Sequence, residues 1–156
     1  MVLLVSILVI GTVAPVPPDN PKAGKPLEQL AGTWIATSVK HSGEELFDPP
    51  STGNLMRFDG MQFVELTGTG KTLLEGKVQV VAGRGSHQID LPRKRLMPGV
   101  AARVVTIAGI CRFTGKDELQ ICYFDPDLVA PGAKRPEKFE STPANGAVLI
   151  TMKRKP

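Results

Sequence analysis

From Leu27 onward the chain alternates between hydrophobic and polar residues with a period of two, which is the pattern of half-buried β-strands. The alternation predicts about eight or nine strands, near 33–40, 55–59, 62–67, 73–81, 88–91, 103–113, 118–123, 138–140 and 148–153. Turn residues separate these segments, and Asp59-Gly60 is the strongest hairpin signal. Before the first strand, residues 27–31 can form one helical turn that Gly32 ends.

The same alternation sorts each strand into an apolar and a polar face. The predicted apolar face holds Met56, Phe58, Val78, Val80, Ile89, Leu91, Val105, Ile107, Cys111, Phe113, Leu119, Ile121, Tyr123, Val148, Ile150 and Met152. The opposite face carries Arg57, Lys77, Gln79, Asp90, Arg112, Gln120, Thr151 and Lys153. Antiparallel strands with one apolar face close most economically as a barrel, which leaves no exposed edges. We therefore predict an all-β fold: an antiparallel meander β-barrel with a short helical turn before its first strand.

The composition fits this fold and limits the function. The chain of 156 residues has room for one domain, and its 16 Gly and 14 Pro supply the turns that many short strands require. The net charge of +4 comes from scattered basic residues, with the densest clusters at 93–95 and 153–155. Nucleic-acid modules interleave such clusters with exposed aromatic residues, and this chain has only six Phe, one Tyr and one Trp. We expect a solvated basic surface and no nucleic-acid partner.

The first 14 residues form an uncharged apolar run that is too short to span a bilayer as a helix. The run matches the apolar core of a secretory signal, although no Lys or Arg precedes it and Pro15 follows Ala14 directly. A basic stretch upstream of Met1, or cleavage later, near Ala23, would account for these departures. A buried N-terminal strand is the alternative interpretation. We expect an exported protein (periplasmic, envelope-associated or secreted) without a transmembrane span.

Residues 15–26 form a different kind of segment, with five prolines. This density excludes a helix or a central strand and favours an extended linker. The expected organisation is an export segment over 1–14, a linker over 15–26 and one barrel domain over 27–156.

Short motifs along the domain carry a resemblance to a known family. They are Gly32-Thr33-Trp34, Phe58-Asp59-Gly60, Ile89-Asp90-Leu91, Gly109-Ile110-Cys111, Leu119-Gln120-Ile121-Cys122-Tyr123, Arg135-Pro136-Glu137-Lys138-Phe139 and Lys153-Arg154. In this order they resemble the planctomycete-type lipocalin-like domain of unknown function, over about Leu27 to Lys155. The family has Tyr in place of Cys111 and Phe in place of Tyr123, and both differences would alter the lining of a pocket. The resemblance implies a lipocalin-like (calycin) barrel in an export-associated setting, and it implies no activity.

The resemblance also implies a structural floor for the barrel, formed by Gly32, Trp34 and Arg154. In lipocalin-like barrels the opening Trp closes one end, and a late basic residue stacks on it. Arg154 shares the face of Ile150 and Met152, so its side chain can reach inward. Such a cation–π contact is worth about 0.5 to 2 kcal/mol.

The sequence has no recognisable catalytic motif, and we expect neither an enzyme nor a cofactor. The run 68–72, Gly-Thr-Gly-Lys-Thr, lacks the earlier Gly and the following helix of a phosphate-binding loop, so a turn is the better interpretation. Ser86, His87 and Asp90 cannot converge as a triad, because neighbours on a strand alternate between faces.

A metal site is not expected either. The two histidines, His41 in a turn and His87 at a strand edge, lack the spacing to a Cys pair that zinc requires, and we expect His41 to be exposed. Asp125 and Asp127 supply too few oxygen ligands for calcium, so a solvated turn is expected there.

The two cysteines of an exported chain invite a disulfide. However, Cys111 shares the apolar face with Phe113, whereas Cys122 falls on the opposite face with Gln120. Side chains on opposite faces of adjacent strands cannot reach disulfide geometry. We expect two free thiols, and a one-residue bulge in the 114–118 turn would reverse this expectation.

Two hypotheses for the function follow. The first is a binding module whose barrel holds a small apolar or amphipathic ligand. Its candidate lining is Ala36, Ser38, Met56, Phe58, Val80, Ile107, Cys111, Phe113, Ile121 and Tyr123. The second is a cell-envelope interaction or structural domain with a filled core, which meets a protein partner through the Pro-rich loop 125–136. An enzyme, a hydrolase in particular, is a distant third.

Overall fold

The structure, a computed structural model, describes residues 24–46, 54–97, 99–129 and 134–156. For residues 24, 95–97 and 100 only the backbone is described. The predicted export segment and residues 15–23 of the predicted linker lie outside the described residues. The described part confirms the all-β fold and the short helix before the first strand.

The elements follow one another as short strands joined by turns. They are α1 Gly24–Leu30, β1 Gly32–His41, β2 Glu44–Glu45, β3 Leu55–Asp59, β4 Gln62–Leu66, β5 Thr72–Lys77, β6 Gln79–Val81, β7 His87–Met97, β8 Val100–Gly115, β9 Glu118–Phe124 and β10 Ala147–Arg154.

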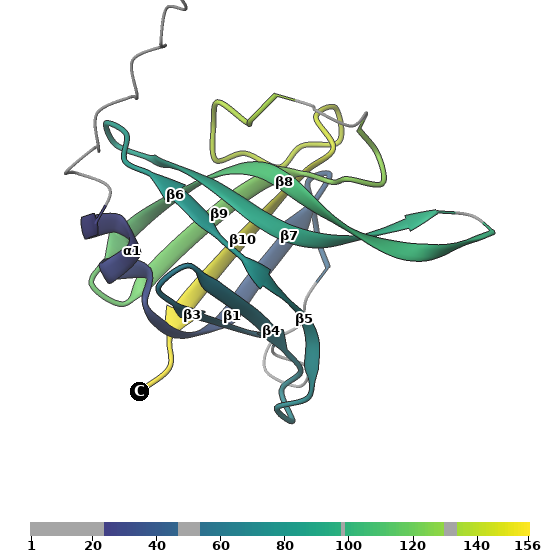
Figure 1. Ribbon diagram of the computed structural model, residues 1–156. Helices are drawn as coiled ribbons and strands as arrows, with labels where there is room; N and C mark the ends of the chain where they lie inside the picture. The colour runs from purple at the N-terminus through teal and green to yellow at the C-terminus, as the bar shows by residue number, and fades with distance from the viewer. Residues whose placement is uncertain (1–23, 47–53, 98, 130–133) are drawn as a thin grey trace, which may run out of the picture.

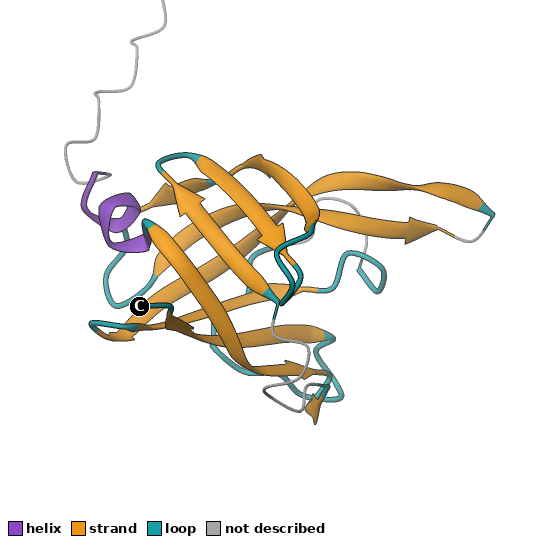
Figure 2. Ribbon diagram, turned by 90° about the horizontal axis from the view of Figure 1, so that it is seen from below, coloured by secondary structure: helices purple, strands orange, loops and turns teal. Residues whose placement is uncertain are grey.

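The strands form one antiparallel sheet that curls into a nearly closed barrel (Figures 1 and 2). Neighbouring strands pair in the order β5-β4-β3-β1-β10-β9-β8-β7-β6, and β2 pairs with β1 off this path. The two ends of the path, β5 and β6, are separated in the sequence by Val78 alone. One bent segment therefore pairs with β4 through β5 and with β7 through β6. Beside the bend, the backbone N–H of Val78 donates to the Met61 carbonyl at 2.8 Å.

A seam remains between β5 and β7, whose described residues do not pair with each other. The ring of Pro92 in β7 lies against Gly76 in β5, since a Cβ added at Gly76 would come 3.0 Å from Pro92 Cγ. Proline cannot donate a ladder hydrogen bond, so it is tolerated at such an unpaired edge. The predicted strand end at Leu91 is therefore wrong: β7 continues through Pro92 to Met97, and with β8 it forms a hairpin that projects from the barrel (Figure 1).

The predicted strand at 138–140 is also wrong. Bends form at residues 137–139, within a segment, residues 134–140, that lies against the outer face of the barrel. Arg135 Nη1 donates to the carbonyls of Ile89 and Gly109 at 2.9 Å each, and its Nη2 lies 2.6 Å from Asp90 Oδ1. Phe139 packs on an outer apolar cluster of Ile110, Cys122 and Ala147. Hydrogen bonds from the Arg135 side chain and packing of Phe139 therefore attach this segment to the barrel without strand pairing, which a strand pattern does not predict.

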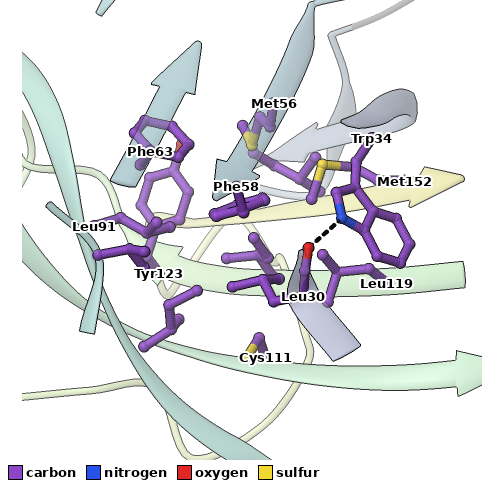
Figure 3. Close-up of a cluster of buried hydrophobic side chains, with 14 of the residues drawn as sticks. Leu30, Trp34, Met56, Phe58, Phe63, Leu91, Cys111, Leu119, Tyr123 and Met152 are labelled. Carbon is purple, nitrogen blue, oxygen red and sulfur yellow. Dashed lines mark hydrogen bonds between the residues drawn. The ribbon is translucent and has the colours of Figure 1, made fainter. Parts of the chain in front are cut away.

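The barrel interior is filled by the apolar face that the alternation predicts. Its buried members are Leu30, Trp34, Ala36, Met56, Phe58, Phe63, Leu74, Val78, Val80, Ile89, Leu91, Ile107, Cys111, Leu119, Ile121, Tyr123, Val148, Ile150 and Met152, while Val105 and Phe113 are partly buried. Figure 3 shows Trp34 with Leu30 and Leu119 on one side of this cluster, and Tyr123 with Phe63 and Leu91 on the other.

The floor of the barrel forms where the first and last strands meet. Trp34 is fully buried and pairs across the ladder with Arg154, whose guanidinium carbon lies 4.2 Å from the indole centroid. The indole Nε1 donates to the Leu30 carbonyl at 2.7 Å (Figure 3). Arg154 also donates to the carbonyls of Ala31 and, at 2.7 Å, Gln29. The predicted contact between Trp34 and Arg154 is therefore present, and the guanidinium caps helix α1 as well.

The floor yields a test of stability. Trp34→Ala removes a large buried aromatic ring and should lower the free energy of unfolding by about 3 to 5 kcal/mol. Arg154→Ala should lower it by about 1 to 3 kcal/mol, because a stacked cation and hydrogen bonds to helix carbonyls are lost together. Since both act through one contact, the double variant should lose less than the sum of the two losses.

Urea or thermal unfolding of the single and double variants measures these values. Lys153→Ala, at the exposed position next to Arg154, is the matched control and should leave stability within about 0.5 kcal/mol of the wild type. Strict additivity of Trp34→Ala and Arg154→Ala would show that the stacking contact does not couple them.

Candidate functional site

A bulge in β1 sets the lining of the upper barrel. The pairing of β1 with β10 shifts between Ala36 and Ser38, so Thr37 is the extra residue and the alternation changes phase there. Ser38 consequently hydrogen-bonds the Glu45 carboxylate on the exposed side, at 2.9 Å, and Val39 faces the interior in its place. The prediction that Ser38 lines the barrel is therefore wrong, because a bulge reverses the faces of every later residue in a strand.

A pocket of about 380 Å³ opens at the end of the barrel opposite Trp34 and α1. Its size lies at the lower end of the range for small-molecule sites, about 300 to 1,000 Å³. It is lined by Ala36, Val39, Asn54, Met56, Glu65, Leu73, Leu74, Arg93, Lys94, Tyr123 and Ile150. The wall is thus largely apolar, with a few polar groups gathered on the side of β4 and β7.

The predicted lining residues divide into two groups. Ala36, Met56 and Tyr123 line the pocket. The remaining inward residues do not line it, because they are packed into the hydrophobic core of the barrel: Phe58, Val80, Ile107, Cys111, Phe113 and Ile121. Phe113 lies close to the floor, with its ring centroid 6.2 Å from that of Trp34. Within the described residues, core side chains therefore fill the barrel next to Trp34, and the pocket lies at its upper end.

An ion pair within the barrel is the main polar feature of the pocket. Arg93 is 7% exposed, the only charged residue that the described part of the chain buries. Its Nη1 lies 2.7 Å from Glu65 Oε2, and the other carboxylate oxygen of Glu65 accepts from Asn54 Nδ2 at 3.4 Å. Among the described residues, Arg93 Nε is buried without a hydrogen-bond partner. Buried donors are normally satisfied, so this N–H marks an incomplete site.

Two aromatic rings hold the guanidinium of Arg93 from inside the barrel. Its carbon lies 5.1 Å from the ring centroid of Tyr123 and 5.9 Å from that of Phe63. Burial raises the pKa of Tyr123, and the positive charge of Arg93 only partly offsets this effect. The Tyr123 hydroxyl is therefore protonated at neutral pH and can serve as a hydrogen-bond donor.

Glu65 and Arg93 are not among the lining residues predicted from the sequence, although alternation places both inside the barrel. Phe63 and Glu65 lie two apart on β4, and Ile89, Leu91 and Arg93 continue one face of β7, so strict alternation would have placed both charges inside. The predicted strand 88–91 ended before Pro92, so Arg93 was not considered as an inward residue. The signal was therefore in the sequence, in the form of a charge at an inward position.

The residues considered for catalysis or metal binding from the sequence have other partners in the structure. Asp90 is engaged by Arg135, and His87 Nδ1 accepts from the Gly83 N–H at 3.4 Å. His41, expected to be exposed, is half-buried, with Nε2 at 3.1 Å from Asp125 Oδ2. Within the described ranges no group of three or more His, Cys, Asp or Glu side chains could hold a metal ion.

Among the residues that the structure describes, no helix is long and apolar enough to cross a membrane. Comparison with known proteins found no matching family model, curated protein or solved structure.

Both cysteines are buried free thiols, and they lie on opposite faces as predicted. Cys111 is in the barrel core opposite Ile121, while Cys122 is in the outer cluster and pairs with Ile110 across the ladder. Burial raises the pKa of Cys111 to about 12 and that of Cys122 to about 11. Neither thiol is therefore a reactive nucleophile near neutral pH, because the thiolate is the reactive form.

The raised pKa values predict how the thiols react with an alkylating reagent at pH 8. The folded protein should remain unlabelled, since both groups are protonated and covered. After unfolding without reductant, both cysteines should be labelled, and intact mass spectrometry counts the adducts. An unlabelled unfolded chain, lighter by the two hydrogens lost on oxidation, would show a disulfide and a wrong register.

Proposed function

We propose that the chain is a non-catalytic binding module that holds a small amphipathic molecule in the upper part of its barrel. The observation that carries this proposal is the 380 Å³ pocket, which combines an apolar wall with polar groups on one side. Ligand sites in general pair a mostly apolar surface with a few placed polar groups. An amphipathic ligand fits this division, with its apolar part against Ala36, Met56 and Ile150.

The alternative is a structural or interaction domain of the cell envelope, and the filled lower part of the barrel favours it. Its predicted docking loop, 125–136, is partly engaged within the molecule itself: Arg135 hydrogen-bonds the barrel and Pro136 is buried. Residues 130–133 of that loop lie outside the described residues. Probe binding in the pocket distinguishes the two functions.

The test uses the neutral fluorescent probe N-phenyl-1-naphthylamine with the full chain. Wild-type protein should bind the probe and raise its emission, since the pocket offers an apolar wall. Val39→Phe fills the pocket from a half-buried wall position and should weaken binding by roughly tenfold or more.

The matched control is Val81→Phe, the same exchange on β6 at a side chain 47% exposed. It should leave the affinity of the probe unchanged. Equal weakening by both substitutions, or absence of binding to the wild type, would favour the filled structural domain instead.

We further propose that residues 1–14 direct export and that the mature domain works outside the cytoplasm, as its apolar N-terminal run predicts. N-terminal sequencing of the protein recovered from its own host should then find a start between Pro15 and Gly24. An intact Met1 on soluble cytoplasmic protein would contradict export, whatever the pocket binds.

A further inference from the structure

We infer that the head group of the ligand is a single carboxylate and that Arg93 binds it. The inference rests on the proposed function and adds to it the chemical class of the ligand. Three features of the pocket carry it: an unsatisfied donor on Arg93, a surplus of one positive charge, and a competing carboxylate within the protein.

The first feature is the way Glu65 holds Arg93. Guanidinium groups are planar forks that recognise carboxylates through two parallel N–H···O bonds. Glu65 Oε2 engages Nη1 at 2.7 Å, and Nε on another edge of the fork is buried with no hydrogen-bond acceptor among the described residues. An unmade hydrogen bond of this kind is costly, and a carboxylate that takes over the guanidinium from Glu65 would supply the missing acceptor.

The second feature is the charge around the pocket. Arg93 and Lys94 contribute two positive charges to its lining, and Glu65 contributes one negative charge. One monoanion therefore balances the site. A dianionic phosphate monoester would leave an uncompensated negative charge beside the half-buried Glu65, which is unfavourable away from bulk water.

The third feature is that the present partner of Arg93 is a carboxylate itself. Glu65 is also held by Asn54, so it has an alternative hydrogen-bond donor when a ligand takes over the guanidinium. In the absence of ligand, the Glu65 carboxylate occupies the position that the ligand carboxylate would take on Arg93. Tyr123, whose ring lies against Arg93, adds a protonated hydroxyl to the same corner of the pocket.

The geometry also gives the ligand an orientation. Arg93 and Glu65 come from β7 and β4, whereas Ala36, Met56 and Ile150 come from β1, β3 and β10. The strands β3, β1 and β10 are neighbours in the sheet and form the other part of the wall, with β4 next to β3. A medium-chain aliphatic carboxylate would thus place its head on the β7 side and its tail toward β1.

Isothermal titration calorimetry of the full chain at pH 8 with decanoate, decan-1-ol and decyl phosphate tests the inference. Decanoate should bind about 10- to 100-fold more tightly than decan-1-ol, the range of a charge-assisted hydrogen bond, and more tightly than decyl phosphate. Glu65→Gln should tighten decanoate binding, because the competing carboxylate is gone, and should leave decan-1-ol unaffected.

Arg93→Met should reduce the affinity for decanoate to that for decan-1-ol. Lys77→Met, on the exposed outer face of β5, removes the same charge outside the pocket and should preserve the preference. If Arg93→Met does not fold, the wild-type ligands and Glu65→Gln decide the question.

The outcomes separate the two proposals. Equal binding of decanoate and decan-1-ol by the wild type would refute the carboxylate inference and leave the amphipathic pocket standing. So would a preference that survives Arg93→Met, or tighter binding of decyl phosphate. Failure of all three compounds to bind would refute the proposed function, and the carboxylate inference with it.

Discussion

The barrel depends on the closure between its first and last strands, where Trp34 and Arg154 face each other at the floor. The Arg154 guanidinium makes three contacts there: it stacks on the indole, forms an ion pair with Asp117 (Nε to Oδ1, 3.3 Å), and donates to carbonyls at the end of α1. A helix leaves its last carbonyls unpaired, so these hydrogen bonds fix the helix across the open end of the sheet. Gly32 is required at this point, because it has a φ of +120° and a Cβ would lie 2.7 Å from Arg154 Nη1.

Because the floor of the barrel is closed, the position of the pocket is restricted to the rest of the barrel. With α1, Leu30 and Trp34 closing the floor, the pocket lies at the other end of the barrel. The bulge at Thr37 then acts on that end alone, because it changes the facing of β1 above Ala36 and leaves Trp34 in phase. The two ends of one strand thus have different tasks: the first positions a large ring that fills the barrel, and the second presents Ala36 and Val39 to an open space.

The sequence predicts the parts of this structure that follow from local periodicity. The inward positions on β3, β8, β9 and β10 and the separation of the two cysteines depend on alternation within one strand. The stacking at the floor was expected from the resemblance to lipocalin-like barrels, and alternation added only that Arg154 can reach inward. Ser38, Arg93 and the 138–140 segment were predicted wrongly or missed for a shared reason. Each depends on an event outside the strand itself: an extra residue in the ladder, a proline tolerated at an unpaired seam, or an arginine that replaces strand pairing with side-chain hydrogen bonds. Such events are decided by tertiary structure, and alternation does not encode them.

The pair of Glu65 and Arg93 is best understood by asking what the barrel would gain without it. A buried ion pair often contributes less to stability than apolar residues of the same volume, because both charges must be desolvated. Apolar side chains at these two inward positions would continue the packing of Phe63, Ile89 and Leu91 to the top of the barrel. The chain instead places there its only buried charge among the described residues, with one donor unsatisfied and a pocket beside it. Departures from the most stable arrangement concentrate at functional sites, since binding needs groups that remain incompletely satisfied until the ligand is present. The two ends of the barrel thus differ in their polar contacts. At the floor, Trp34 and Arg154 donate to carbonyls of α1 and the residue after it, whereas Arg93 near the pocket keeps one donor without an acceptor among the described residues.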